Sequence, residues 1–386
     1  MGFKKGILFL HRWLGFISGL VVFIVSITGC IFCFQDEIQD ALCPYRTVAV
    51  QNKPYADPSV LKQIALKQHP GATADYIYYY GKSRPANVLV NVPKQGFLSV
   101  YLNPYTGQVT HSEVTTKNFF VVVEYLHLYL LLPAKIGAMI VGVSVIVFVI
   151  IMITGIVLWW PKRKSERKRS FTIKWNGRWR RVNYDLHNVL GFYATSIALI
   201  LAFTGLSISY DWVRDGIYKT ANLGKTYTAE KVFPKSDSLN KQLLASKPAV
   251  DKAFVTAQSK APNAQMFLVY ADPAASGTIS ITAYAHSLHF GNSDYFFFDN
   301  YTAKLLQYLP DSKKSAGLKL NDLNYDIHVG QVLGLTGKII AFLASLICAT
   351  LPVTGFIVWM GKRKKKKGTP VKKAVHRRLH KQLATH

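Results

Sequence analysis

Four apolar runs, each long enough to cross a lipid bilayer, constrain this chain more than any other feature of its sequence. They lie at 13–34, 136–160, 189–210 and 339–360, and none contains Lys, Arg, Asp or Glu. About 20 apolar residues, rising about 1.5 Å each, match the roughly 30 Å of hydrocarbon in a bilayer. The sequence therefore predicts an α-helical membrane protein with four transmembrane helices.

The basic residues predict how these spans are oriented. The chain has 47 Lys and Arg against 20 Asp and Glu, and 24 of the 47 lie within 1–12, 162–181 and 362–381. Short basic segments mark the cytoplasmic side of a membrane protein. We therefore expect both termini in the cytoplasm, a basic cytoplasmic loop over 161–186 and a basic cytoplasmic tail over 362–386. Because the charge is confined to these segments, we expect it to contact the lipid membrane and not nucleic acid.

Matching motifs indicate that the chain arose by internal duplication. A His-x-x-Leu-Gly motif opens the first span at His11 and the third span at His187, at an offset of 176 residues. Each span also contains a Thr-Gly pair, and in the second and fourth spans this pair leads through Trp into a Lys-Arg run. The Thr-Gly pairs lie at 28–29, 154–155, 204–205 and 354–355.

The connections on the outer side are predicted to form two small α+β domains, over 35–135 and 211–337. In each, a helix-like segment precedes a β-rich stretch and a hairpin with an Asn-containing turn. The helix-like segments are 58–69 and 249–260, the β-rich stretches 75–92 and 265–284, and the hairpins 97–109 and 294–306. The expected transmembrane helices are 1–34, 136–160, 187–210 and 338–361, with a short interfacial helix before the second of them.

Four histidines at the ends of the spans are the candidate ligands. The topology places His11 and His187 at the cytoplasmic face, and His127 and His328 at the outer face. Two imidazoles at one depth on different helices are what bis-histidine ligation of a haem iron requires. The absence of a Cys-x-x-Cys-His motif excludes covalent attachment. We therefore expect two haem b groups, one between His11 and His187 and one between His127 and His328.

Small residues beside two of these histidines fit the same interpretation. Gly15 and Gly191 lie four residues after His11 and His187, one turn along on the same helix face. We expect the missing side chains to leave room for a flat macrocycle, although Gly in a span also serves ordinary helix packing. His286 and His289 in the second outer domain are close enough to share a site, and we assign them no role.

Several common cofactor motifs are missing from the sequence. It has no Gly-x-Gly-x-x-Gly motif after a strand, no Walker A motif and no His-Glu-x-x-His motif. A redox protein without a nucleotide-binding domain must receive electrons from elsewhere. The candidate donors are a membrane quinol, a free reduced flavin and a cytoplasmic reductase.

At these motifs the sequence resembles the PepSY-associated transmembrane family. The resemblance rests on the two His-x-x-Leu-Gly openings, the two Thr-Gly-x-x-x-Trp exits and the Asn-Pro-Tyr-Thr-Gly turn at 103–107. Within that family the architecture is similar to the inner-membrane ferrisiderophore reductases. The resemblance implies PepSY-like domains in the bacterial periplasm and reduction of a ferric siderophore to release Fe(II). It also implies haem ligation by the four histidines named above.

Two other kinds of protein remain open at this point. A non-catalytic membrane protein could use its PepSY-like domains to bind or regulate a periplasmic partner, with the four histidines purely structural. An iron or haem transporter would show polar residues or broken helices in mid-membrane. Pro352 is the only obvious helix breaker in the middle of a span.

Overall fold

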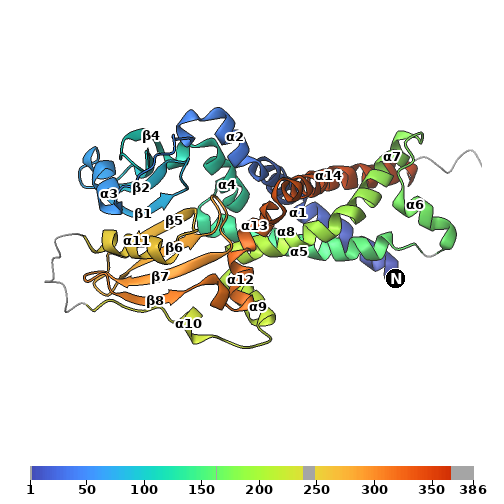
Figure 1. Ribbon diagram of the computed structural model, residues 1–386. Coiled ribbons are helices and arrows are strands. Elements are labelled where there is room, and N and C mark those ends of the chain that lie inside the picture. Colours follow the sequence, from blue (N-terminus) through green and yellow to red (C-terminus); the bar gives the residue numbers. More distant parts are fainter. Residues whose placement is uncertain (1, 162, 238–247, 367–386) are drawn as a thin grey trace, which may run out of the picture.

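The long helices and the β-sheet lie at opposite ends of an elongated molecule (Figure 1). The computed structural model describes residues 2–161, 163–237 and 248–366. The N-terminus, the segment that follows the second long helix and the end of the last helix all lie at the end away from the sheet (Figure 1). We call this the loop end of the molecule and the opposite end the sheet end.

Within the described ranges, four helical runs are long and apolar enough to cross a membrane, as the sequence predicts. Two of them are single helices, α1 and α5. The third run joins α7, the π-helical segment η4 and α8, and the fourth joins the 3₁₀ turn η7 to α14. Their bounds are α1 Phe3–Cys33, α5 Ala134–Trp159, α7 Trp179–Asp185, η4 Leu186–Leu190, α8 Gly191–Ser209, η7 Gln331–Leu333 and α14 Gly334–Lys366.

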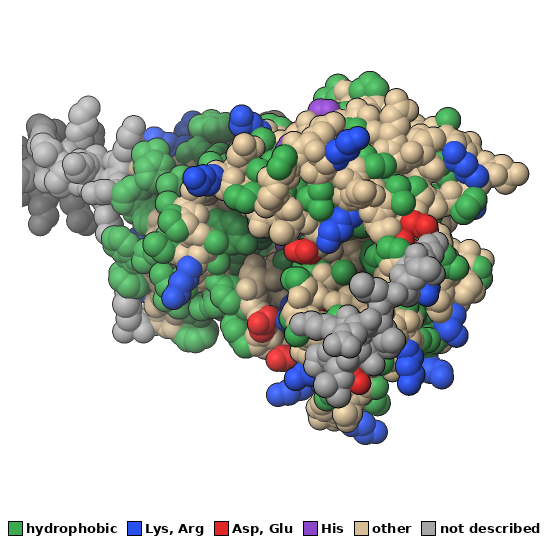
Figure 2. Space-filling view, turned by 90° about the vertical axis from the view of Figure 1, so that its left-hand side faces the viewer, with side chains coloured by type: hydrophobic (Ala, Val, Ile, Leu, Met, Phe, Trp, Pro, Cys, Tyr) green, Lys and Arg blue, Asp and Glu red, His purple; other side chains and the backbone are tan. Residues whose placement is uncertain are grey.

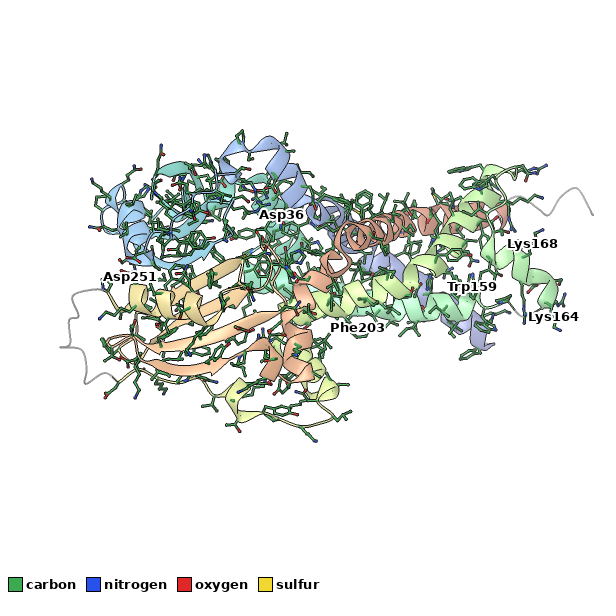
Figure 3. The ribbon with its side chains drawn as sticks, in the orientation of Figure 1. Asp36, Trp159, Lys164, Lys168, Phe203 and Asp251 are labelled. Carbon is green, nitrogen blue, oxygen red and sulfur yellow. The ribbon has the colours of Figure 1, made fainter. Side chains whose placement is uncertain are left out.

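Small side chains fill the interior of the helical bundle, and large apolar side chains face outward. Ser18 and Gly19 of α1 and Ala198 and Ala202 of α8 are buried. Phe203, next to Ala202, lies on the outer surface of the bundle (Figure 3). Hydrophobic side chains cover the helical part in Figure 2, whereas charged side chains lie over the sheet part. This arrangement is typical of helices that pack closely in lipid.

The basic loop lies at the loop end. It contains the 3₁₀ turn η3 (Lys164–Glu166) and α6 (Arg167–Phe171), and Lys164 and Lys168 project there (Figure 3). The N-terminal basic residues share this end. The tail over 362–386 lies outside the described residues from 367 onward. The described basic segments thus meet at one end, while their position in the cytoplasm remains a prediction.

The two outer segments share one antiparallel sheet of eight strands in the order β4-β3-β2-β1-β5-β6-β7-β8. We expected a separate sheet in each segment. Instead β1 and β5 pair edge to edge, with Ile77 opposite Val269 and the rings of Tyr76 and Tyr270 stacked at 4.5 Å. An exposed strand edge is a template for further pairing, and here each segment uses the edge of the other.

Within each segment the strands fall where the sequence predicts β-structure and a hairpin. The first segment provides β1 to β4 and the second provides β5 to β8. Their bounds are β1 Thr73–Tyr79, β2 Ala86–Val92, β3 Gly96–Leu102, β4 Val109–Val114, β5 Met266–Ala271, β6 Thr278–Tyr284, β7 Ser293–Asp299 and β8 Leu305–Leu309.

Two helices cover one face of this sheet. They are α3 (Pro58–Lys67) and α11 (Ala249–Lys260), which match the predicted helix-like segments. Leu61 of α3 and Phe254 of α11 lie fully inside the core that the strands form. The buried carboxylate of Asp251 joins the two helices, because it accepts hydrogen bonds from the backbone N–H and the hydroxyl of Ser59.

Shorter helices connect the sheet to the bundle. The helix α4 contains His127 and corresponds to the short helix expected before the second span, and α13 contains His328. The connecting elements are α2 Gln35–Leu42, η1 Pro44–Arg46, η2 Thr115–Lys117, α4 Phe119–Tyr129, α9 Asp211–Ala221, α10 Thr228–Lys231, η6 Asp311–Lys313, α12 Ala316–Asp322 and α13 Asn324–His328.

Removing the Asp251 carboxylate should loosen the contact between α3 and α11. In Asp251→Ala, the partly buried Ser59 N–H loses its acceptor, which costs about 1 kcal/mol. We expect faster amide hydrogen exchange in α3 and α11, measured by mass spectrometry on the full chain. The control is Asp211→Ala, whose side chain is 84% exposed and should change exchange very little. Equal exchange in the two variants would contradict this role for Asp251.

Candidate functional site

The four candidate histidines form two pairs, each built by helices distant in the sequence. His127 of α4 and His328 of α13 make the sheet-end pair, with ring centres 6.1 Å apart. His11 of α1 and His187 of η4 make the loop-end pair, with ring centres 6.4 Å apart. The structure therefore brings together the same residues that the sequence analysis grouped, and their role as ligands remains a prediction.

Each imidazole is held by a threonine on a neighbouring helix. In all four cases Nδ1 lies within hydrogen-bond distance of the Oγ1 atom of a Thr-Gly pair. The pairs are His11–Thr154 (3.0 Å), His127–Thr28 (3.0 Å), His187–Thr354 (3.0 Å) and His328–Thr204 (2.9 Å). Every Thr-Gly pair noted in the sequence is therefore used once.

These hydrogen bonds determine the tautomer of each ring. The hydroxyl of Thr28 donates to the backbone carbonyl of Ile24 at 2.8 Å, and the other three threonines donate to carbonyls one turn earlier in the same way. A hydroxyl has a single proton. Because that proton is already used, each threonine must accept from the histidine Nδ1–H. In the neutral imidazole the lone pair is then on Nε2, which is the form of histidine that binds metals.

The glycine after each threonine makes room for the imidazole. A Cβ atom at Gly205 would lie 3.0 Å from Cε1 of His328, and one at Gly355 would lie 3.1 Å from Cε1 of His187. Gly29 and Gly155 stand in the same relation to His127 and His11, at 3.5 and 3.4 Å. Each Thr-Gly pair is thus a seat in which threonine orients the ring and glycine admits it.

Gly15 and Gly191, in contrast, are expected from the sequence to leave room for a flat macrocycle beside the histidines. A Cβ atom at Gly15 would meet nothing within 4 Å, and one at Gly191 would meet only Leu351, at 3.5 Å. Neither glycine contacts a histidine ring. Their role in leaving room for a macrocycle remains a prediction. The glycines that contact the rings could also have been identified from the sequence, because a Thr-Gly pair occurs in every span.

Two asparagines, which the sequence analysis missed, brace the histidines of the second half. Asn183 and Asn324 each lie four residues before a paired histidine. Their Nδ2 atoms donate to the backbone carbonyls of Thr354 and Thr204, at 3.1 and 3.0 Å. The corresponding positions in the first half are Ile7 and Val123, so only the second half has this brace.

The local backbone also distinguishes the two histidines of the loop-end pair. His11 lies in the regular helix α1, whereas His187 lies in the π-helical turn η4. A π-helical turn inserts an extra residue into a helix and frequently marks a functional site, because it changes the direction of a side chain. In this helix it occurs at the residue that must face His11.

A cavity of about 230 Å³ inside the bundle contains the sheet-end pair. We call it the bundle cavity. His127 and His328 line it together with mainly apolar side chains from the long helices. Gly29, Gly142 and Gly205 also line its wall. An apolar pocket with two imidazoles is suited to a large flat cofactor with a metal at its centre.

The spacing of each pair fits one metal ion between the two rings. Two metal–nitrogen bonds of about 2 Å, plus about 1 Å from each nitrogen to its ring centre, place the centres about 6 Å apart. The observed separations are 6.1 and 6.4 Å. Together with Nδ1–H groups that donate to threonine, this spacing fits the axial ligands of a haem iron.

The two pairs are well separated along the bundle. His11 and Thr28 lie 17 residues apart on α1, and His187 and Thr204 lie 17 residues apart on the run of η4 and α8. Because Thr28 and Thr204 hold the sheet-end histidines, the pairs are about 25 Å apart along the helix axes. One pair therefore lies near each end of the bundle.

His286 and His289 lie together in the loop between β6 and β7, with ring centres 5.8 Å apart. The Nδ1 atom of His289 is 3.9 Å from a carboxylate oxygen of Asp326. Burial lowers the pKa of His289 despite this carboxylate. These two residues stand apart from the four paired histidines, and the structure assigns them no chemistry.

A methyl group at a Thr-Gly seat should disturb the site. In Gly205→Ala, the new Cβ atom would press on the His328 ring at 3.0 Å, at a cost of about 1–3 kcal/mol. In Gly15→Ala, the Cβ atom enters open space, and the change should stay within about 0.5 kcal/mol. Thermal unfolding of the two variants in detergent would test this. Equal unfolding temperatures for Gly205→Ala and Gly15→Ala would contradict the role of Gly205 in making room for the His328 ring.

Comparison with protein families agrees with the geometry. A family model described as the PepSY-associated TM region matches residues 8–362. No match is found among curated proteins. Because the family model covers nearly the whole chain, including all four paired histidines and all four Thr-Gly seats, this protein belongs to the PepSY-associated transmembrane family.

Proposed function

We propose that this protein is a membrane oxidoreductase with two haem b groups, which carries electrons across the bacterial inner membrane to a ferric chelate in the periplasm. The observation that carries the proposal is that the four histidines form two similar pairs, one near each end of the bundle. Each has the spacing of two axial ligands of one iron, and the two lie about 25 Å apart along the bundle.

A haem with two axial histidines accepts and donates single electrons and needs no open coordination position. The residues of the chain supply the rest of the site. Thr28 and Thr204 keep the proton on Nδ1 of the sheet-end histidines and fix the orientation of the rings. A hydrogen bond from a ligating histidine to an acceptor also raises the basicity of the ligand. The wall of the bundle cavity is mainly apolar.

The loop end is suited to the entry of electrons. Its basic residues attract anionic groups, such as the carboxylates of a cofactor or the surface of an acidic partner. The buried Nε atom of Arg12, next to His11, has no hydrogen-bond partner among the described residues, so it can take a carboxylate. The donor remains a quinol, a reduced flavin or a cytoplasmic reductase.

The sheet end is suited to the exit of electrons. The sheet-end pair lies where the bundle meets the sheet, and α4 and α13 connect the two parts. Reduction of iron(III) to iron(II) weakens its attraction to oxygen ligands, because the charge on the ion falls. A ferric siderophore reduced at this end would then release its iron.

The structure supports a redox role more than the alternatives. A transporter of this kind is expected to contain a broken helix at the membrane centre, but α14 continues through Pro352 without interruption. A purely regulatory protein would have no need of four histidines that each contact a threonine through Nδ1 and that are paired at the spacing of a metal ion.

Loss of one sheet-end ligand should stop electron transfer. We expect His328→Ala to bind one haem in place of two and to lose transmembrane reduction by about 100-fold or more. The assay uses vesicles with a reductant inside, and outside a ferric chelate with a chromophore specific for iron(II). The control is His69→Ala, in the turn after α3. Two haems retained in His328→Ala would show that this pairing is wrong.

Thr204, which accepts the hydrogen bond from His328, should influence the midpoint potential and the affinity of the haem at the sheet-end pair. Thr204→Val removes the acceptor of His328 Nδ1–H, which makes the imidazole less basic and stabilises ferric iron less. We expect the midpoint potential of one haem to rise and its affinity to fall about 10- to 100-fold. Thr204→Ser should restore both values. Thr350→Val, whose hydroxyl bonds only to its own helix, should leave both unchanged, and the same shift in both valine variants would refute the role of Thr204.

A further inference from the structure

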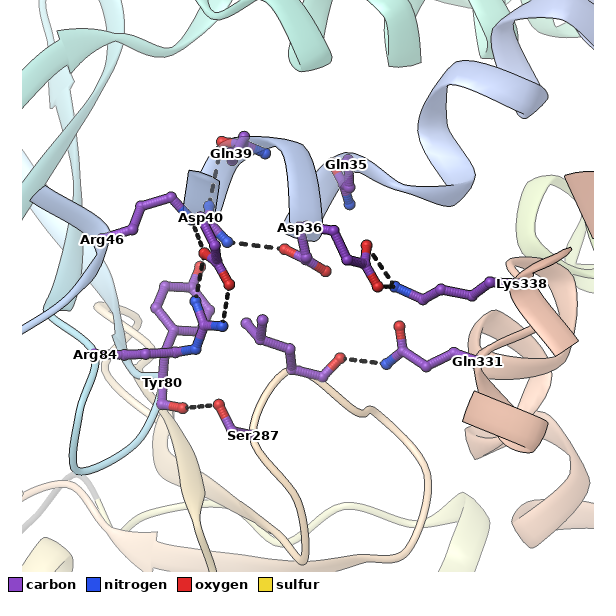
Figure 4. A network of polar contacts seen from close by, with 12 residues as sticks. Gln35, Asp36, Gln39, Asp40, Arg46, Tyr80, Arg84, Ser287, Gln331 and Lys338 are labelled. Atoms are coloured by element: carbon purple, nitrogen blue, oxygen red, sulfur yellow. Dashed lines mark hydrogen bonds and ion pairs between the residues drawn. The ribbon is translucent and has the colours of Figure 1, made fainter. Parts of the chain in front are cut away.

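A second cavity lies between the bundle and the sheet. Its volume is about 260 Å³, and it is lined by α2, by α4 and by strands of the first half of the sheet. We call it the interface cavity. Its charged lining residues are Asp36, Arg46, Arg84, Glu113 and Glu124. Figure 4 shows the polar network along its edge.

The interface cavity adjoins the sheet-end pair. Glu124 and Tyr325 line both the interface cavity and the bundle cavity. They lie three residues before His127 and His328, one helical turn away from each. A molecule in the interface cavity is therefore separated from the cavity of the sheet-end pair by these side chains.

The positive charges at this cavity are already compensated. Arg46 pairs with Asp36 at 2.8 Å and with Asp40 at 2.7 Å, and Arg84 donates two hydrogen bonds to Asp40 (Figure 4). Burial alone would raise the pKa of Asp40, but hydrogen bonds and charge from Arg84 and Arg46 lower it. The two guanidinium groups are therefore both paired with aspartates.

The remaining groups offer negative charge and hydrogen-bond acceptors. The Glu113 carboxylate accepts a hydrogen bond from Asn118 Nδ2 at 3.0 Å and lies 3.7 Å from Nε2 of His111. Burial raises the pKa of Glu124, and neither of its protonation states supplies a positive charge. The walls also include the aromatic side chains of Tyr80, Tyr101 and Phe290, whose ring faces attract cations.

A buried acceptor on the cavity wall has no partner. Asn87 on β2 is only 7% exposed, and its Oδ1 atom has no hydrogen-bond partner among the described residues. A buried polar atom left unpaired costs about 1–3 kcal/mol. This atom is independent of the charges, and a ligand that presents an N–H or O–H group would satisfy it.

We propose that the interface cavity is the docking site of the terminal electron acceptor, and that it selects neutral or positively charged ferric chelates with hydrogen-bond donors over anionic ones. This inference rests on the proposed function. Docking involves no covalent step. If His127 and His328 hold a haem, that haem would supply the single electron and would be oxidised as iron(III) of the chelate becomes iron(II).

The test uses one linear trihydroxamate chelator whose terminal amine is free, acetylated or succinylated. These forms carry one positive charge, no charge and one negative charge around the same metal centre. Each is loaded with gallium(III), which matches iron(III) in charge and is not reduced. Binding to the full-length protein in detergent is measured by calorimetry.

We expect the free amine to bind at least about tenfold more tightly than the succinylated form. Glu113→Gln should reduce that ratio, because it removes the negative charge and keeps the shape of the side chain. Asn87→Leu should weaken the binding of all three forms about equally. The control Asp211→Asn, on the exposed surface of α9, should leave the ratio unchanged.

Equal affinity for the three forms, tighter binding of the succinylated form or no binding of any form would overturn the inference. So would an unchanged ratio in Glu113→Gln. Because gallium binding needs no electron transfer, the outcome is separate from that of the proposed function. The expected charge order, without reduction of the iron(III) forms, would support the docking site and refute the reductase.

Discussion

Four hydrogen bonds between histidine Nδ1 atoms and threonine hydroxyls hold the rest of this structure in place. Each one joins residues that are 99 to 167 positions apart in the sequence. Each threonine has already donated its proton to its own helix, so the bond can run only from histidine to threonine. The same contact therefore packs two helices together, orients an imidazole and selects its tautomer. Glycine follows each threonine, and at Gly205 and Gly355 a Cβ atom would lie only 3.0 and 3.1 Å from the imidazole ring.

The other features of the fold serve to maintain these contacts. Small residues such as Gly19 and Ala198 let the helices approach closely enough for the seats to form. The β1–β5 pairing ties the two outer segments into one sheet above the sheet-end pair. Asn183 and Asn324 fasten two of the histidine-bearing segments to the threonine carbonyls opposite. The sheet thus lies against one end of the bundle, and the interface cavity lies between the two.

The sequence predicted local structure and the grouping of the histidines, but not the contacts between neighbouring helices. Apolar length revealed the four spans, and alternating patterns located both hairpins. Periodicity along one helix pointed to Gly15 and Gly191, yet the glycines that contact the rings lie on other helices, and no single-helix pattern can show which helix is the neighbour. The shared sheet was missed for the same reason, since the pairing of β1 with β5 crosses almost 200 residues. Asn183 and Asn324 could have been found, because both lie four residues before a paired histidine.

The central claim is that each histidine pair holds one haem. The most direct measurement is a redox titration of the purified wild-type protein, followed by optical spectroscopy and combined with a pyridine haemochrome count. The account predicts two haem b groups per chain, low-spin spectra in both oxidation states and two one-electron steps. A folded protein that remains colourless after expression with ample haem would contradict it, and the histidine pairs would then have to be explained as structural contacts alone.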